Sequence, residues 1–195
     1  VRMNDAGAVL LGKLQTHEFA LGGPSFDLPW PPARNPWNPE RHPGGSSSGA
    51  GAAVASGMLP GAIGSDTGGS VRHPASICGI VGMKPTYGLV SRAGVVPLSF
   101  SLDNLGPLTR TVEDNAILLG AIAGHDPRDP ASARTAPRDY AAGVGKGVKG
   151  LRIGHIRHFY TTDMQADAEM AAAVDNAAAL LRELGAEVEE VTVAP

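Results

Sequence analysis

The sequence predicts an α/β fold, and three observations lead to this prediction. Strand-like segments at residues 151–156 and 186–193 flank a helical pattern over 167–184, an order that favours a crossover in a partly parallel sheet. A second helix is predicted over residues 111–123. The 195-residue chain is 43% hydrophobic and 18% charged, a composition typical of a globular domain with a sizeable core.

The N-terminal part alternates short apolar segments with glycine- and proline-rich ones. Residues 8–15 (AVLLGKLQ) have a strand-like apolar pattern, and Gly7 would end a short helix before them. Residues 22–43 are rich in proline and contain both tryptophans, which predicts an irregular but well-packed excursion.

Residues 44–70 form a stretch of small amino acids in which Asp66 is the only charged residue. Within it, residues 49–57 (GAGAAVASG) predict a short buried helix that the preceding serines could cap. Residues 60–66 (PGAIGSD) predict a strand that runs into a glycine turn. Such composition suits backbones that cross closely, and it argues against a flexible linker. Two further apolar segments follow, at residues 77–83 and 88–97.

The helix over residues 111–123 has a Thr111 cap, acidic residues in its first turn and Gly124 to end it. Its apolar stripe consists of Val112, Leu119 and Ile122. Residues 125–149 are polar and predict a surface loop. In the last helix, Val174, Ala178 and Leu181 share one face, and Gly185 is expected at the C-cap.

Composition and charge exclude several classes of function. The formal net charge is −3 and the basic residues are scattered, so direct nucleic-acid binding is not expected. No apolar run is long enough for a membrane helix. The single cysteine, Cys78, has no partner for an intrachain disulfide; it fits a reducing compartment, and we expect a cytoplasmic protein. The chain begins without Met and ends within a strand pattern, so we expect it to be truncated at both ends.

Several short motifs resemble known sites but lack the required context. Gly44 and Gly49 have the spacing of a phosphate-binding loop, but alanine stands where that loop needs lysine. Ser47 lies in a G-x-S-x-G pattern without the preceding strand of a nucleophile elbow. The Asp66-Thr67-Gly68 sequence would need a second copy to form a paired-carboxylate protease site. No metal site is expected, because His155 and His158 have no ligand partners at metal spacing.

Ser70 is the strongest candidate nucleophile. It follows the strand over 60–66 and a glycine turn, where the N–H groups of Thr67, Gly68, Gly69 and Ser70 can form an anion-binding nest. Serine also needs a base, and no histidine is well placed; His73 is the nearest in sequence. The serines at 46–48 suggest another arrangement, in which one serine relays the proton to a distant lysine.

Longer motifs now resemble one family, the amidase signature hydrolases. The similar segments are GKLQTHEFALGG, PGGSSSG, GSDTGGSVR, the run from Pro74 to Asp114, and AGHDPRDPAS. The resemblance implies an α/β/α sandwich around a mixed, partly parallel sheet. It also implies an acyl-enzyme mechanism with Ser70 as nucleophile and Ser46 as relay, the latter after a cis peptide bond and within about 3 Å of Ser70 Oγ.

The resemblance further implies an oxyanion hole formed by the N–H groups of Thr67, Gly68 and Gly69. Ala20 matches a position close to the bound acyl group. One departure is Ser48, which stands where the family usually has glycine. A second departure is the catalytic lysine, which the family carries upstream of the segments present here; Lys13 and Lys84 do not match it.

We therefore expect residues 1–195 to be a single core fragment of an amidase that cleaves a small amide without any cofactor. The fragment alone is expected to be inactive, and a homodimer is possible. Two alternatives remain open: the glutaminase subunit of a tRNA-dependent amidotransferase, or a non-catalytic fragment. The segment VPLSFSLDNLGP slightly favours a stand-alone amidase.

Overall fold

The computed structural model describes residues 1–23, 25, 27–136 and 138–194. The chain divides into two compact units, Val1–Ala142 and Gly143–Pro195, which are treated separately below. The expectation of a single core over residues 1–195 stays a prediction.

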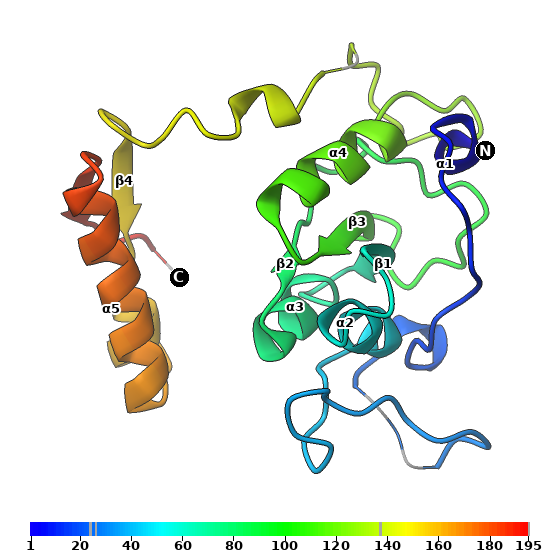
Figure 1. The fold of residues 1–195 in the computed structure, drawn as a ribbon, viewed down its shortest axis with the longest axis horizontal. Coiled ribbons are helices and arrows are strands. Elements are labelled where there is room, and N and C mark those ends of the chain that lie inside the picture. The colour runs from blue at the N-terminus through cyan, green and yellow to red at the C-terminus, as the bar shows by residue number, and fades with distance from the viewer. Residues whose placement is uncertain (24, 26, 137, 195) are drawn as a thin grey trace. The chain divides into compact units, whose positions relative to one another are not determined.

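A three-stranded antiparallel sheet forms the centre of the first unit (Figure 1). Its order is β1 (Gly61–Asp66), β3 (Asn104–Thr109) and β2 (Val81–Gly82). The register pairs Ala62 with Leu108 and Asp66 with Asn104. Strand β1 therefore ends beside the start of β3, and the chain leaves the sheet at Asp66.

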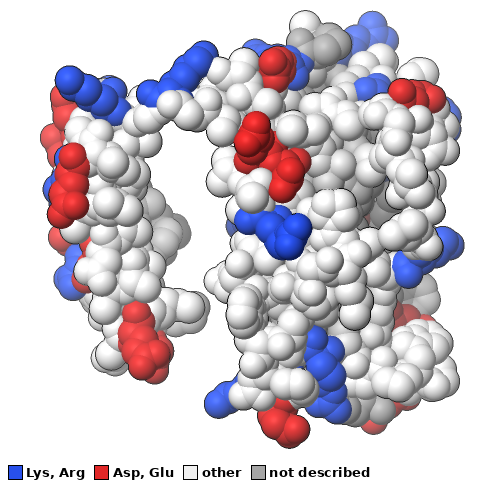
Figure 2. Space-filling model, viewed as in Figure 1, with Lys and Arg blue, Asp and Glu red and all other residues white. Residues whose placement is uncertain are grey.

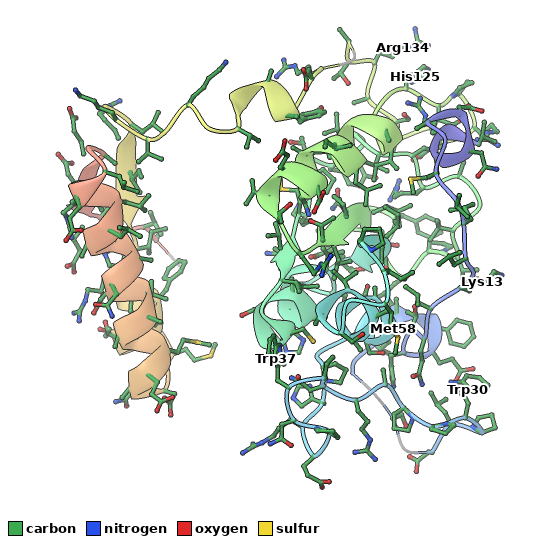
Figure 3. All side chains as sticks on the ribbon, in the orientation of Figure 1. Lys13, Trp30, Trp37, Met58, His125 and Arg134 are labelled. Atoms are coloured by element: carbon green, nitrogen blue, oxygen red, sulfur yellow. The ribbon has the colours of Figure 1, made fainter. Side chains whose placement is uncertain are left out.

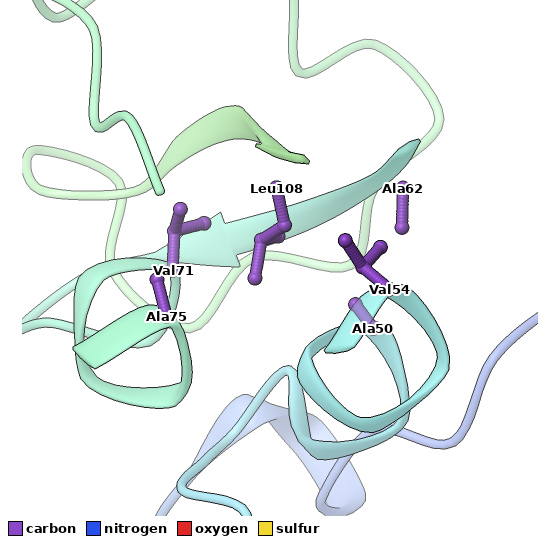
Figure 4. Packing of buried hydrophobic residues seen from close by; sticks show 6 residues of the cluster. All are labelled: Ala50, Val54, Ala62, Val71, Ala75 and Leu108. Carbon is purple, nitrogen blue, oxygen red and sulfur yellow. The ribbon is translucent and has the colours of Figure 1, made fainter. Parts of the chain in front are cut away.

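Helices cover both faces of this sheet. On one face, α2 (Ser48–Ala55) and α3 (Arg72–Cys78) enclose a core that includes Leu108 of β3, as Figure 4 shows. On the other face, α4 (Val112–Ile122) packs through Leu119 and Ile122 against a cluster that includes Ile63 and Leu105. The predicted α/β class and its α/β/α layers are confirmed.

Glycines in the small-residue stretch lie where other backbone or side-chain atoms approach closely. A Cβ added to Gly49 would lie 2.5 Å from the backbone nitrogen of Gln15, and one added to Gly64 would lie 2.6 Å from Ser47 Oγ. Both distances are shorter than any stable carbon contact. The stretch is therefore packed core, and α2 is buried as predicted.

The predicted strand over residues 8–15 is wrong. After α1 (Arg2–Asp5) and Gly7, which has a φ of +82°, the chain runs without regular structure to the 3-10 turn Glu18–Ala20. Val9 and Leu11 are largely exposed. An apolar pattern forms a strand only where another strand completes its hydrogen bonds, and none lies beside this segment among the described residues.

The proline-rich segment over residues 22–43 is irregular as predicted, but it is not well packed. Trp30 and Trp37 are 50% and 74% exposed, and Figure 3 shows both on the extended loop below α2 and α3. The indole N–H of Trp37 is anchored to the carbonyl of Cys78 at 2.8 Å. Residues 24 and 26 of this segment lie outside the described residues.

Helix α3 and strand β3 of the first unit were not predicted. Helix α3 begins with the sequence RHP, and Pro74 masked its helical pattern, although proline is tolerated in a first turn. Strand β3 contains Gly106 and Pro107, which weaken a strand pattern. Gly106 is required there because an added Cβ would clash with the carbonyl oxygen of Met83.

Residues 125–149 are only partly the exposed loop that was predicted. Asp126, Asp129 and Ser132 are buried. The two aspartates tie the segment to residues 91 and 92, because Ser91 donates to Asp126 and the Arg92 N–H donates to Asp129, both at 2.8 Å. Beyond residue 133 the loop is mostly exposed, and its described part contains a 3-10 turn, Ala141–Gly143. Residue 137 lies outside the described residues.

Helix α4 has the predicted cap residue and the predicted glycine after its end. Helix α4 starts after Thr111, whose hydroxyl accepts a hydrogen bond from the Asp114 N–H, and Gly124 follows its end with a φ of +125°. Of the predicted stripe, Leu119 and Ile122 are buried, whereas Val112 is exposed.

The second unit has the predicted strand–helix–strand order. Strands β4 (Arg152–His155) and β5 (Glu187–Glu190) pair in parallel, and α5 (Ala168–Glu183) lies between them in the sequence. A π-helical turn, Phe159–Asp163, follows β4. Gly185 has a φ of +92° directly after the C-cap. Among the described residues, parallel and antiparallel pairings thus both occur, in separate sheets.

A carboxylate on α5 organises the polar side of this unit. Asp175 accepts hydrogen bonds from Arg157 and Tyr160, and the first of these is the main reason that its pKa falls to about 2. On the face shown in Figure 2, acidic and basic side chains are interspersed. None of the helices in the described chain is long and apolar enough to span a bilayer.

The core of the first unit provides a stability prediction. Leu108 is fully buried between α2 and α3, so Leu108→Ala should lower the free energy of unfolding by about 2–5 kcal/mol. Urea denaturation would measure the loss. Leu102→Ala, at a neighbouring leucine that is 57% exposed, is the matched control and should change stability by about 0.5 kcal/mol or less. Equal effects of the two variants would contradict this assignment of the core.

Candidate active site

The turn after β1 is organised by one buried carboxylate. Asp66 is completely buried, and its Oδ1 accepts hydrogen bonds from the Gly69 N–H at 2.8 Å and Arg72 Nη2 at 2.9 Å. Its Oδ2 accepts from the N–H groups of Val71 and Arg72 and from Arg72 Nε. The side chain therefore fixes the path of residues 66–72.

These contacts also control the charge of Asp66. Burial on its own raises the pKa of this carboxyl. Hydrogen bonds from the Arg72 side chain and from nearby backbone N–H groups outweigh burial and hold the pKa below its usual value of 3.8. Asp66 is therefore an anion at neutral pH, and the turn around it is preformed.

Ser70 stands at the end of this turn and is half-buried. The N–H groups of Gly68 and Ser70 have no acceptor among the described residues. The Gly69 N–H was predicted to be an oxyanion donor, but it already donates a hydrogen bond to Asp66. Of the expected oxyanion donors, Gly69 is thus engaged inside the turn, while Gly68 keeps an unpaired N–H group; Ser70, a member of the predicted nest, keeps one as well.

Ser46 lies in the adjacent segment and is completely buried. The Gly45–Ser46 peptide bond is cis, as the resemblance implies, and the Ser46 carbonyl accepts a hydrogen bond from the His17 N–H at 2.9 Å. Its hydroxyl makes no hydrogen bond within the described part of the chain, so the expected contact with Ser70 Oγ is not formed. A buried hydroxyl without a partner is rare in native proteins.

Ser47 joins the serine segment over residues 46–48 to strand β1 and the turn that carries Ser70. Its N–H donates to the Ser70 carbonyl at 3.4 Å, and its Oγ donates to the Ser65 carbonyl and accepts from the Ser65 N–H, both at 3.2 Å. The predicted serine cap of α2 is therefore wrong. Ser47 is the N-cap residue, but its hydroxyl binds strand β1 and leaves the helix N–H groups without a side-chain partner.

His73 does not serve Ser70 in this structure. Its Nδ1 lies 3.3 Å from both the nitrogen and the oxygen of Gly45, and its ring lies 5.9 Å from that of His42. The histidine therefore braces the residue before Ser46. Of the two lysines near the motifs, Lys84 donates to the Pro85 carbonyl, and Lys13 is exposed.

A pocket of about 330 Å³ opens beside the turn. Ala20 and Thr67, both predicted site residues, line it together with apolar side chains of residues 95–100. Ala20 and its neighbour Phe19 have positive φ angles of 60° and 53°, which non-glycine residues seldom adopt. Such backbone conformations are enriched at ligand-binding sites.

Sequence reasoning missed two residues of the site. Arg72 and Asp103 both bind the turn, Arg72 through Asp66 and Asp103 through the Thr67 hydroxyl. Nothing in the spacing indicates Asp103, because it lies 36 residues from Thr67. Arg72 could have been found, because it lies in the GSDTGGSVR motif, six residues after the only charged residue of the small-residue stretch, Asp66.

Comparison with known proteins agrees with this geometry. The A subunit of glutamyl-tRNA(Gln) amidotransferase from Moorella thermoacetica is 54% identical over 98% of this chain and 39% of its own length. The crystal structure of the same subunit from Thermotoga maritima matches with a TM-score of 0.92 and 45% identity, over 98% of this chain and 42% of the other. The peptide amidase of Stenotrophomonas maltophilia matches with a TM-score of 0.87 and 41% identity, over 98% of this chain and 40% of its own.

The chain thus spans about two fifths of the length of the curated relatives that it matches. The profile of the family described as Amidase matches residues 1–195, the whole of this sequence. With the two serine segments brought together beside a glycine turn, and with these matches, the chain belongs to the amidase signature family.

Proposed function

We propose that the protein containing this chain cleaves carboxylic amide C–N bonds through an acyl-serine intermediate on Ser70. One observation carries the proposal: Ser47 links the Ser70 turn to Ser46, whose hydroxyl is buried and unpartnered among the described residues. A hydroxyl in that state needs a proton donor or acceptor, which a relay between a nucleophile and a base would supply.

The first step is attack of Ser70 Oγ on the amide carbonyl carbon, which forms a C–O bond and places negative charge on the carbonyl oxygen. The unpaired N–H groups of Gly68 and Ser70 are suited to stabilise this oxyanion, with the Thr67 N–H as a further donor. The Ser70 proton passes through Ser46 toward the base and then to the leaving nitrogen. The C–N bond breaks, and water hydrolyses the acyl-enzyme.

The base is a lysine in this proposal, as the family resemblance implies, and it comes from outside the 195 residues. A lysine enclosed beside Ser46 would be uncharged near neutral pH, because burial disfavours its charged form. It could then accept the proton from the Ser46 hydroxyl. The same contact would give that hydroxyl the partner it lacks here.

The pocket beside Thr67 would receive the acyl group of the substrate. Its lining is mainly apolar and includes Ala20, Val96, Leu98 and Phe100. Its volume of about 330 Å³ suits a small acyl group. We therefore propose a small-molecule amide as substrate.

A glutaminase subunit is the second candidate. It is favoured by identities of 48% and 54% to the A subunits of two glutamyl-tRNA(Gln) amidotransferases, since glutamine is itself a carboxylic amide. The chemistry at Ser70 would be the same, and only the acceptor of the released ammonia would differ. The two candidates share the site and differ in partners.

The nucleophile assignment predicts the effect of Ser70→Ala. In the full-length protein, this change should lower amide turnover by about three orders of magnitude or more and abolish labelling by a fluorophosphonate probe, because no covalent intermediate can form. Circular dichroism and thermal unfolding should remain as in the wild type.

Ser76→Ala, at an exposed serine on α3, is the matched control and should keep full labelling. Labelling of the Ser70→Ala protein at the wild-type rate would reject the assignment.

The Asp66 contacts predict how stability depends on pH. Asp66→Asn should lower the free energy of unfolding at pH 7 by about 1–3 kcal/mol, because an amide cannot accept all the hydrogen bonds that this carboxylate accepts. The pKa of Asp66 is lowered by folding, so its contribution is complete above about pH 4 and is lost as the pH falls further.

The stability difference between wild type and Asp66→Asn should therefore shrink below pH 4. Urea unfolding at pH 7, 5 and 3 would measure it for both proteins. A difference that stays constant over this range would show that the Asp66 charge does not hold the turn.

Activity measurements separate the two candidate functions. For a stand-alone amidase, we expect hydrolysis of small amides by the purified full-length protein, with no change when amidotransferase partner subunits and tRNA are added. For a glutaminase subunit, ammonia release from glutamine should rise at least tenfold with those additions. The Ser70→Ala protein measures the background in both assays.

A further inference from the structure

Asp103 is another buried carboxylate, and it joins two segments that the proposed reaction brings together. Its Oδ1 accepts a hydrogen bond from the Thr67 hydroxyl, and its Oδ2 accepts from the N–H groups of Leu98 and Ser99, each at 2.9 Å. The residue is 7% exposed.

Thr67 is the first residue of the nucleophile turn and directly precedes Gly68, whose N–H is unpaired among the described residues. Asp66 holds the later part of that turn, through the N–H groups of Gly69, Val71 and Arg72. The Thr67 hydroxyl bond to Asp103 holds the earlier part. The unpaired Gly68 N–H thus lies between two anchored positions.

On the other side of Asp103, Leu98 belongs to residues 95–100, which form the apolar wall of the 330 Å³ pocket. This wall has its own anchors at Arg92. The Arg92 guanidinium donates to the Phe100 carbonyl and to the Tyr87 hydroxyl at 2.9 Å each, and the Arg92 N–H donates to buried Asp129 at 2.8 Å. The wall is therefore a supported structure, and Asp103 connects it to the turn.

We propose that Asp103 is a positioning residue for amide hydrolysis: through the Thr67 hydroxyl it fixes the nucleophile turn against the wall of the acyl pocket. This inference rests on the proposed function at Ser70. As a consequence, a substrate that contacts the pocket wall keeps a fixed position relative to the oxyanion donors, because Asp103 is hydrogen-bonded both to the turn and to the wall. Small errors in such register lower the rate of the chemical step more than they weaken binding.

The sharpest variant is Thr67→Val, which keeps the shape of the side chain and removes only the hydroxyl. We expect kcat in the full-length protein to fall about tenfold or more, with KM changed less than threefold, because the oxyanion donors lose register. Thr67→Ser restores a hydroxyl and should recover most of the loss. The rate of Ser70 labelling by a fluorophosphonate should follow kcat.

Asp103→Ala and the double variant Thr67→Val/Asp103→Ala complete a cycle. If both residues act through one contact, the double variant should be no slower than Asp103→Ala alone. Leu102→Ala, at the exposed residue beside Asp103, is the matched control and should keep wild-type kinetics. The proposal would be overturned if the loss of kcat in the double variant equalled the product of the losses in the two single variants. It would also be overturned if kcat of the Thr67→Val protein stayed within twofold of wild type.

The link itself has a readout that needs no turnover. Hydrogen exchange should quicken in both segments, 66–72 and 96–103, when either Thr67→Val or Asp103→Ala is introduced. Exchange that changes in only the mutated segment would overturn the coupling. A wild-type protein that neither hydrolyses amides nor labels at Ser70 would instead refute the proposed function, and the exchange result would still decide whether the two segments are coupled.

Discussion

The anionic carboxylate of Asp66 is the constraint on which the candidate site depends. It is fully buried, and it accepts hydrogen bonds from three backbone N–H groups and from the Arg72 side chain. A buried charge is tolerated only when it is satisfied in this way. The chain between β1 and α3 must therefore curl around the carboxylate, and this places Ser70 at the end of the turn with unpaired N–H groups beside it.

Close packing brings the second serine segment to this turn. Gly49 and Gly64 lie where a Cβ would collide with Gln15 and Ser47, so the small residues allow α2, β1 and the N-terminal segment to approach each other. Ser47 then bonds to β1 and to the Ser70 carbonyl, and Ser46 becomes buried next to it. An uncharged, glycine-rich stretch thus forms a tightly packed part of the site.

Local patterns and long-range contacts differed in how well they could be predicted. Helix α4 and the β4–α5–β5 unit were predicted because their caps and periodicity lie within each element. The strand predicted over residues 8–15 is wrong because an apolar pattern cannot show whether a partner strand is present. Strand β3 was missed for the opposite reason: pairing with both β1 and β2 outweighs its Gly106 and Pro107.

The sequence by itself determined the α/β class, the helix predicted over residues 49–57 and the strand predicted over residues 60–66, because these follow from composition and local pattern. Ser70 was a candidate because it follows a glycine turn, and Ser46 was a candidate through the resemblance to the amidase signature family. Only the tertiary structure decided which groups are free to act. It engages the Gly69 N–H with Asp66, directs the Ser47 hydroxyl to β1, and links Thr67 to Asp103 across 36 residues. Hydrogen-bond partners depend on which segments lie side by side in the folded chain, and the spacing of residues along the sequence does not show this.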